Sequence, residues 1–157
     1  GAIAEGQVRA FFDKLLPSES ELALARAEGL FKAGRLDEAE AELAKVKFDP
    51  DYEARIDALK QGIAYARAGK SGPGVDELKA KVAANPVDHE ARLALAGLYA
   101  GGKRYREAMD ELVEIVRRAK DWKEGEARKQ LLSLFTIAGD QPELVSEYRR
   151  KLASALY

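Results

Sequence analysis

Three places in the sequence carry residue types that could do chemistry, and the first is Gly69-Lys70-Ser71. It is similar to the end of a phosphate-binding loop, in which backbone N–H groups and a lysine hold phosphate oxygens. The full motif needs a glycine where Ala64 stands, and its loop follows a strand, whereas the residues before Gly69 have helical periodicity. We therefore interpret Gly69 as a helix stop and do not predict nucleotide binding.

The second and third places are a lone histidine and a group of carboxylates. His89 is the only histidine, so a histidine-rich metal site cannot be built, and no triad can be proposed beyond this imidazole with nearby Asp88 and Glu90. We interpret His89 as a solvated residue in the first turn of a helix. Asp49, Asp51 and Glu53 flank a proline turn at a helix start, where the helix dipole favours acids. The chain has no cysteine, which excludes disulfides, thiolate zinc sites and thiol catalysis. We predict a protein that is not an enzyme, with no catalytic residue, no metal site and no cofactor.

The elements that must position any binding residues repeat with a period near 35 residues. In one register a small residue is followed three places later by a large one, and in a second register a similar pair is spaced by four. Two registers with one period are typical of the helix–turn–helix tetratricopeptide repeat, in which small residues lie where helices touch and large ones lie between them. The first register is Ala27/Leu30, Gly62/Tyr65, Ala96/Tyr99 and the degenerate Leu132/Phe135; the second is Ala39/Leu43, Gly74/Leu78, Ala108/Leu112 and Leu144/Tyr148.

This repeat predicts an all-α fold, a tetratricopeptide-like right-handed stack of about four antiparallel helix pairs with one extra N-terminal helix. We expect residues 1–17 to be a terminal segment that contains the extra helix, and residues 18–157 to form the repeat domain. Phe31, Tyr65, Tyr99 and Phe135 are expected to wedge between helices. The helices of the pairs are expected over residues 20–33, 36–47, 52–68, 75–84, 90–100, 105–120, 126–138 and 143–157.

Composition narrows the classes of partner. The chain of 157 residues has 26 basic and 27 acidic residues, a net charge of −1, which lacks the electrostatic footprint of a nucleic-acid binder. No apolar run approaches the length that spans a bilayer. We therefore predict neither nucleic-acid binding nor membrane insertion.

The first helices of such a stack line a concave surface that can bind polypeptide. Projection of the repeat places a mixed apolar and charged stripe there, which suits extended, sequence-tolerant binding of client proteins. The alternative is that the superhelix itself covers much of this stripe. The predicted client-groove residues are Leu24, Phe31, Leu59, Lys60, Ile63, Arg67 and Leu93.

The two ends of the chain depart from the repeat. Val8, Phe11, Phe12 and Leu15 give residues 7–16 one strongly apolar face, and we expect this helix to dock on the stack or on a second copy of the chain, which would make a homodimer. At the other end an apolar tip, Leu152 with Leu156 and Tyr157, has no residue after it to cover it. It either packs on the preceding helix or is offered to a partner.

Three segments carry a resemblance to a known family. The opening Gly1-Ala2-Ile3-Ala4-Glu5-Gly6-Gln7-Val8, with the amphipathic helix that continues it, resembles the end of a thioredoxin domain. The segments Val82–Asp88 and Arg104–Leu112, and above all the ending Tyr148–Tyr157, resemble the C-terminal tetratricopeptide half of the YbbN-type thioredoxin-like co-chaperones, or chaperedoxins. The likeness extends over essentially the whole chain.

The resemblance implies a cytoplasmic co-chaperone that holds unfolded client proteins and passes them to a GroEL-type chaperonin. It places the chaperonin contact on the last helix, at Tyr148, Arg149, Leu152, Leu156 and Tyr157. The redox-active thioredoxin segment is absent from this chain, so the resemblance implies a binding module. The alternative is a generic scaffold that binds a defined peptide in its concave groove within a larger assembly.

Overall fold

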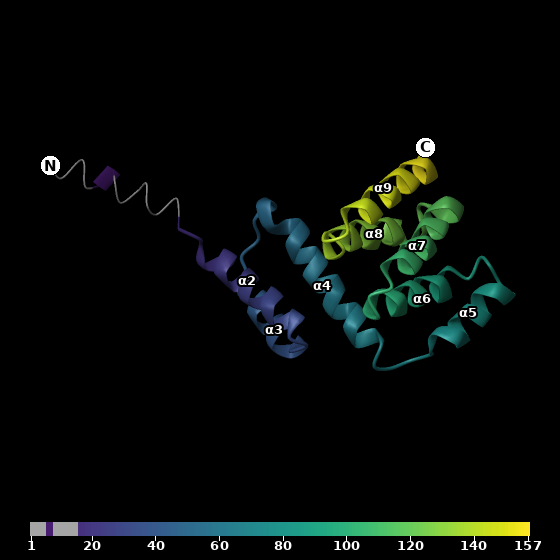
Figure 1. Cartoon of the computed structure of the whole chain (residues 1–157), viewed down its shortest axis with the longest axis horizontal. Coiled ribbons are helices and arrows are strands. Elements are labelled where there is room, and N and C mark those ends of the chain that lie inside the picture. Colours follow the sequence, from purple (N-terminus) through teal and green to yellow (C-terminus); the bar gives the residue numbers. More distant parts are fainter. Residues whose placement is uncertain (1–5, 8–15) are drawn as a thin grey trace. The chain divides into compact units, whose positions relative to one another are not determined.

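A computed structural model of the chain describes residues 6–7 and 16–157, and these residues contain helices and no strand (Figure 1). The prediction of an all-α fold is confirmed. The chain divides into two compact units, Gly1–Ile56 and Asp57–Tyr157, which are described in turn. The predicted amphipathic helix over residues 7–16, with Val8, Phe11, Phe12 and Leu15, lies outside the described residues except at its ends.

The helices follow the predicted order and close to the predicted bounds. Two short 3₁₀ segments, η1 and η2, precede α4 and α8. The elements are α2 (Glu19–Lys32), α3 (Leu36–Leu43), η1 (Pro50–Tyr52), α4 (Glu53–Ala68), α5 (Val75–Ala84), α6 (His89–Gly101), α7 (Tyr105–Ala119), η2 (Trp122–Gly125), α8 (Glu126–Ile137) and α9 (Pro142–Leu156).

The first unit is built on the pair α2 and α3, which pack against each other. The Ser18 hydroxyl caps α2 by accepting a hydrogen bond of 3.1 Å from the Glu21 N–H. Gly34, with a φ of 78°, then reverses the chain into α3. Ala27 and Ala39 are fully buried, as expected for small residues where paired helices touch.

Helix α3 is shorter than the predicted 36–47. Its last carbonyls accept tight i+3 hydrogen bonds, such as Val46 N–H to the Leu43 carbonyl at 3.1 Å. The Lys47 N–H instead donates to the Ser20 hydroxyl on α2, also at 3.1 Å. The segment after α3 is therefore held by the neighbouring helix and leaves the helical path early.

The core of the second unit surrounds α7, which packs against α6, α8 and α9, while α5 packs on α6 (Figure 1). Helix α7 supplies six buried side chains, among them Met109, Leu112 and Ile115 with no exposed surface. Helix α5 contributes only one buried side chain, Leu78. The last helix is part of this core through Leu144, Val145, Tyr148 and Leu152.

The first repeat register marks the packing positions with one exception, and in the second register Gly74 is exposed. Gly62 and Ala96 are buried, as are the predicted wedges Tyr65, Tyr99 and Phe135, whereas Phe31 is half-buried. The exception is the degenerate copy, because Leu132 is exposed and its neighbour Leu131 is fully buried in its place. The small-to-large spacing therefore does not mark the buried position in the last pair, where Leu131 and Phe135 are both buried.

Helix α6 approaches the end of α4 very closely at Gly101. A Cβ added to Gly101 would lie 2.7 Å from the Tyr65 carbonyl oxygen, too close for any other residue type without movement. One turn earlier, a Cβ added to Gly97 would lie 3.5 Å from the Tyr65 ring, an ordinary contact. Tyr65 also donates a buried hydrogen bond of 2.9 Å to Gln130 Oε1 on α8, which links helices of the second and fourth pairs.

The joint between α7 and α8 is a left-handed turn. Lys123, Glu124 and Gly125 all have positive φ, of 51°, 57° and 76°. For the two residues with a Cβ this conformation costs about 1–2 kcal/mol each. Contacts around Trp122 hold it, with the Lys123 ammonium 5.6 Å from the indole ring centroid and 3.2 Å from the Glu90 carboxylate.

Candidate protein-binding surfaces

Two adjoining cavities in the second unit form a groove along α6. One has a volume of about 300 Å³ and the other about 480 Å³, and both include Tyr65, Ala68, Ser71, Pro73 and Leu98 in their linings. These volumes lie in the range of ligand pockets, roughly 300–1,000 Å³. We call this feature the α4–α6 groove and define it by Gln61, Ala64, Ala68, Lys70, Ser71, Pro73, Leu78, Glu90, Leu93, Ala94 and Leu98.

The surface of the groove is mainly apolar. Leu93 and Leu98 are half-buried and present apolar surface from α6, and the exposed side chains Ala64 and Ala68 do so from α4. Burial raises the pKa of the Tyr65 hydroxyl far above its usual range, so this group stays neutral and is occupied by its bond to Gln130. The groove can therefore desolvate an apolar segment without placing it against a buried charge.

The loop of residues 69–74 delays the start of α5, and its residues line one end of the groove. Gly74 caps α5 with extended backbone, and Gly72 has a φ of 97°. Gly69-Lys70-Ser71 lies in this loop, directly after α4, which confirms Gly69 as a helix end. The element before it is a helix, whereas a phosphate-binding loop follows a strand. Lys70 is exposed and has no ion-pair partner in the described part of the chain.

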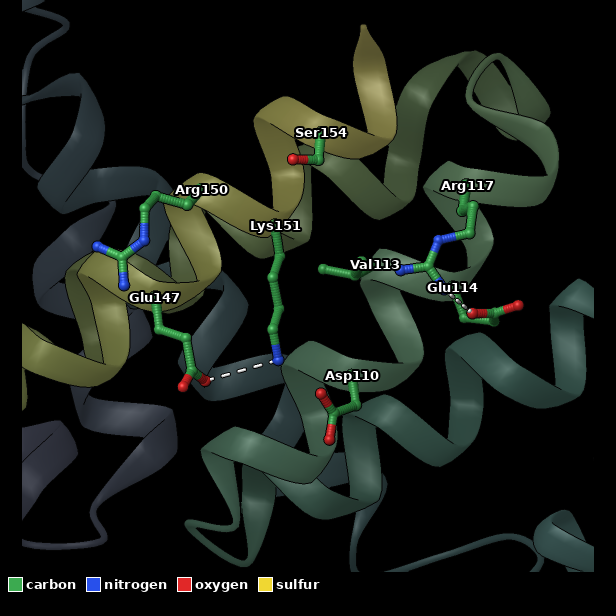
Figure 2. Close-up of a pocket in the computed structure, with 8 residues that line it drawn as sticks. All are labelled: Asp110, Val113, Glu114, Arg117, Glu147, Arg150, Lys151 and Ser154. Carbon is green, nitrogen blue, oxygen red and sulfur yellow. Dashed lines mark hydrogen bonds and ion pairs between the residues drawn. The ribbon is translucent and has the colours of Figure 1, made fainter.

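A second cleft lies between α7 and α9 and has a volume of about 500 Å³ (Figure 2). Six of its lining side chains are ionisable, and Val113 and Ser154 complete it. Figure 2 shows the Lys151 ammonium reaching the Glu147 carboxylate, at 3.6 Å, and Arg117 reaching Glu114, at 2.9 Å. The ionisable residues are Asp110, Glu114, Arg117, Glu147, Arg150 and Lys151.

The charges of this cleft are largely engaged within the protein. A hydrogen bond from Arg106 lowers the pKa of Glu147, and one from Arg118 lowers that of Glu114. The Tyr148 hydroxyl donates to Asp110, and burial raises the pKa of this tyrosine well above its usual range. Val113 is the one apolar side chain in its lining, so the α4–α6 groove is the better candidate for binding an apolar segment.

The structure divides the predicted chaperonin-binding residues into two groups. Tyr148 and Leu152 are buried in the core, and Leu156 packs against it. Of the two alternatives for the apolar tip, packing within the chain therefore holds for Leu152 and Leu156. Only Tyr157 is fully exposed. Arg149 is exposed, although its guanidinium lies 4.9 Å from the Phe135 ring centroid. The expectation that Tyr148 and Leu152 are available to a partner is wrong.

The predicted client-groove residues are also divided. Leu24, Leu59 and Ile63 are buried, so the expectation that a client reaches these side chains is wrong: the apolar stripe of a first helix is used in packing. Phe31 and Arg67 are half-buried and Lys60 is exposed, but none of them lines the α4–α6 groove. Leu93 is the one member of the predicted set that does.

Sequence reasoning missed the alanines of the groove, Ala64, Ala68 and Ala94. Their signal was available, because Ala64 and Ala68 stand four residues apart on α4 and therefore share one face. The delayed start of α5 after Ser71-Gly72-Pro73-Gly74 was a second signal.

The remaining chemical candidates have structural roles. His89 begins α6, but it is half-buried and its ring lies 5.4 Å from that of Trp122, so its interpretation as a solvated residue is wrong. Its Nδ1 atom is buried and has no hydrogen-bond partner among the residues that the structure describes. Asp49 accepts a hydrogen bond of 2.9 Å from the Asp51 N–H and caps η1. Within residues 6–7 and 16–157, no three His, Cys, Asp or Glu side chains are grouped to hold a metal ion.

Comparison with known proteins defines the class that this helical arrangement belongs to. A tetratricopeptide repeat family model matches residues 68–157, more than half of the chain and all of α5 to α9. The chain belongs to the tetratricopeptide repeat family. Among the residues described, no helix has the length and apolar character needed to cross a membrane.

Two individual proteins are similar to this chain. An uncharacterized protein of Haemophilus influenzae is 28% identical over 138 residues, which cover 88% of this chain and 63% of that protein. The chain thus spans less than two thirds of the length of this relative. The crystal structure of a domain of protein VP0806, of unknown function, from Vibrio parahaemolyticus is 26% identical, with a TM-score of 0.48 over 99% of this chain and 94% of that one.

Proposed function

We propose that this chain is a protein-binding module, without catalytic activity, that holds extended apolar segments of client proteins in the α4–α6 groove. The observation that carries the proposal is the continuity of the groove. Its two cavities share five lining residues and together follow most of the length of α6. Family membership supports it as well, because tetratricopeptide repeats are protein-interaction scaffolds.

The energetic basis is transfer of apolar client surface from water onto Leu93, Leu98 and the alanines of α4. Each CH₂ group buried in this way contributes about 0.8 kcal/mol. Association and the ordering of a flexible segment oppose this gain by several kcal/mol. The module should therefore bind short segments weakly and transiently, as suits a protein that holds clients and releases them.

The test places a charge in the groove and an identical charge outside it. Ala94→Glu introduces a carboxylate into the lining from an exposed position on α6, whereas Ala80→Glu does so at an exposed position of α5 that does not line the groove. Each variant is titrated with a blocked Val/Ala hexapeptide while the methyl signals of Leu93 and Leu98 are followed by NMR. The same variants are compared for suppression of the aggregation of a heat-unfolded client protein.

We expect Ala94→Glu to weaken peptide binding by at least tenfold, because the carboxylate is desolvated against an apolar ligand. It should also lose the ability to suppress aggregation, while Ala80→Glu behaves as the wild type. Equal binding by both variants would show that the segment binds elsewhere. Circular dichroism of both variants checks that the helices are intact.

The co-chaperone role is the finer part of the proposal. It comes from the resemblance to the YbbN-type proteins, and it adds docking to a GroEL-type chaperonin through α9. Of the residues that the resemblance assigns to this contact, Arg149 and Tyr157 remain accessible, and Arg150 beside them is exposed without an ion-pair partner among the described residues. Tyr148, Leu152 and Leu156 would act by holding the helix in place.

Chaperonin docking has its own test. Removing all residues from Leu152 onward would delete a core side chain, so a gentler variant is required. We expect removal of Tyr157 combined with Arg149→Glu and Arg150→Glu to abolish capture of the chaperonin in a pull-down, with the helical content retained. Undiminished capture would favour the alternative, a scaffold that binds one defined peptide, for which charge reversal at Lys60 and Arg67 is the matching test.

A further inference from the structure

We propose that the α4–α6 groove selects a charge-polarised segment: five or six extended apolar residues with an acidic group at the Lys70 end and a basic group at the Glu90 end. The inference deepens the proposed function and rests on it. It follows from the length of the groove, from its two free polar side chains and from the opposite charges at its ends.

The length follows from the helix that forms the floor. The lining extends along α6 from Glu90 to Gly102, and at a rise of 1.5 Å per residue these twelve steps span about 18 Å. An extended chain advances about 3.3 Å per residue. Five or six residues therefore fill the groove, and their flanking side chains lie at its ends.

Two polar side chains in the lining are available to the backbone of such a segment. Gln61 is half-buried, Ser71 is exposed, and neither makes a hydrogen bond within the described residues. The amide of Gln130 is different, because it is occupied by Tyr65 and Glu126. Gln61 and Ser71 can therefore satisfy backbone groups that an extended segment would otherwise bury unpaired, which favours extended over helical ligands.

The ends of the groove carry opposite charges. Lys70 in the loop after α4 is exposed without an ion-pair partner among the described residues. Glu90, at the first turn of α6, pairs with Lys123 at 3.2 Å, but the two side chains are 69% and 51% exposed. A surface pair of this kind contributes about 0–1 kcal/mol, so a cationic group of the ligand can share or replace Lys123 at little cost.

The test uses four blocked heptapeptides, Glu-Val-Ala-Val-Ala-Val-Lys, its charge-reversed form Lys-Val-Ala-Val-Ala-Val-Glu, and forms with two Glu or two Lys ends. Both mixed peptides are included because a segment can enter the groove in either chain direction. Binding is followed by NMR titration of the Leu93 and Leu98 methyl groups at low ionic strength. We expect the better mixed peptide to bind about tenfold more tightly than either like-charged peptide, because one end of each like-charged peptide meets a like charge.

Charge reversal in the protein supplies the matched controls. Lys70→Glu should move the preference to the two-Lys peptide and Glu90→Lys to the two-Glu peptide, while the double variant restores preference for mixed ends. Salt at 1 M should remove the differences, since the Debye length falls to about 3 Å. If all four peptides bind equally and Ala94→Glu still weakens them, charge selection is refuted while the proposed function stands. If no peptide perturbs the groove, both are refuted.

Discussion

Replacing Gly101 with alanine tests how closely α6 approaches α4 at the end of the groove. In an exposed helix Gly→Ala usually stabilises a protein, by about 0.5–1 kcal/mol, because alanine loses less backbone entropy on folding. At Gly101 the new Cβ would lie 2.7 Å from the Tyr65 carbonyl oxygen and 3.3 Å from its carbonyl carbon. Both are backbone atoms, so the contact can be relieved only by moving one helix away from the other.

Overpacking of this kind typically costs about 1–3 kcal/mol, which exceeds the entropic gain. Gly97→Ala is the matched control, because it lies one turn earlier on the same helix and its Cβ would meet the Tyr65 ring at 3.5 Å, an ordinary distance. We therefore expect Gly101→Ala to lower the free energy of unfolding of the second unit by about 1–2 kcal/mol. Gly97→Ala should leave it unchanged or raise it by up to about 1 kcal/mol.

Urea unfolding followed by the fluorescence of Trp122 measures this difference, since Trp122 is the only tryptophan and lies in the second unit. The midpoint is compared at constant slope, so that a change in the compactness of the unfolded state is not mistaken for a change in stability. Equal stabilisation by the two alanines would mean that α6 lies farther from α4 at Gly101 than the 2.7 Å contact requires. The lining of the groove at that end would then be incorrect as well.

Three further predictions concern the units and their surface charge. Ser18→Ala removes the cap of α2 and should cost about 1 kcal/mol, measured by circular dichroism during urea unfolding, with Ser18→Asp retaining the cap. Met109→Ala empties a fully buried position of α7 and should cost about 2–5 kcal/mol, a loss that Met109→Leu should largely avoid. The third is that the free energy of unfolding falls as pH drops below about 4.5. Hydrogen bonds and nearby arginines lower the pKa of Glu107, Glu114 and Glu147 in the folded state. The stability that these carboxylates contribute is therefore present above their unfolded-state pKa and is lost as pH falls through their folded-state pKa. Urea midpoints from pH 7 to pH 3 measure this fall, and 0.5 M salt should reduce it.

The opposite shift at Glu111 refines the pH prediction. Burial raises the pKa of this carboxyl, and pairing with Arg92 only partly opposes the effect. A raised pKa contributes stability below the unfolded value that is lost as pH rises through the folded one. Glu111→Gln should therefore make the loss of stability on acidification steeper than in the wild type, and an unchanged profile would contradict this assignment.

The helices were predictable because local rules decide them. Predicted and observed helix ends agree within one or two residues where the sequence has a capping residue or a glycine. Asp88 is an example, because its side chain accepts a hydrogen bond of 3.0 Å from the Ala91 N–H. The end of α3 was not predictable, because it depends on the Ser20 hydroxyl of another helix. The buried polar residues Arg92 and Gln130 were also missed, since their partners lie 19 and 65 residues away in the chain.

The binding surface was less predictable than the fold, for a physical reason. Periodicity identifies a face of a helix as apolar but does not say whether another helix covers it. Such a stripe predicts Leu59 and Ile63 in a groove, but both are buried, while the α4–α6 groove is lined in part by alanines, which a hydrophobicity pattern underrates. Its existence depends on how late α5 begins, and that is set by the geometry of a loop.

The hydrogen bond between Tyr65 and Gln130 has a consequence for how the second unit unfolds. In a simple repeat array each helix pair touches only its neighbours, so terminal pairs can fray one at a time. Here a buried bond of 2.9 Å joins α4 to α8 and bypasses the pair between them. Losing the last pair also breaks this bond, so we expect unfolding of the fourth pair to destabilise the second. For the proposed client-binding module, this coupling would connect fraying at the C-terminal end to the α4 side of the groove.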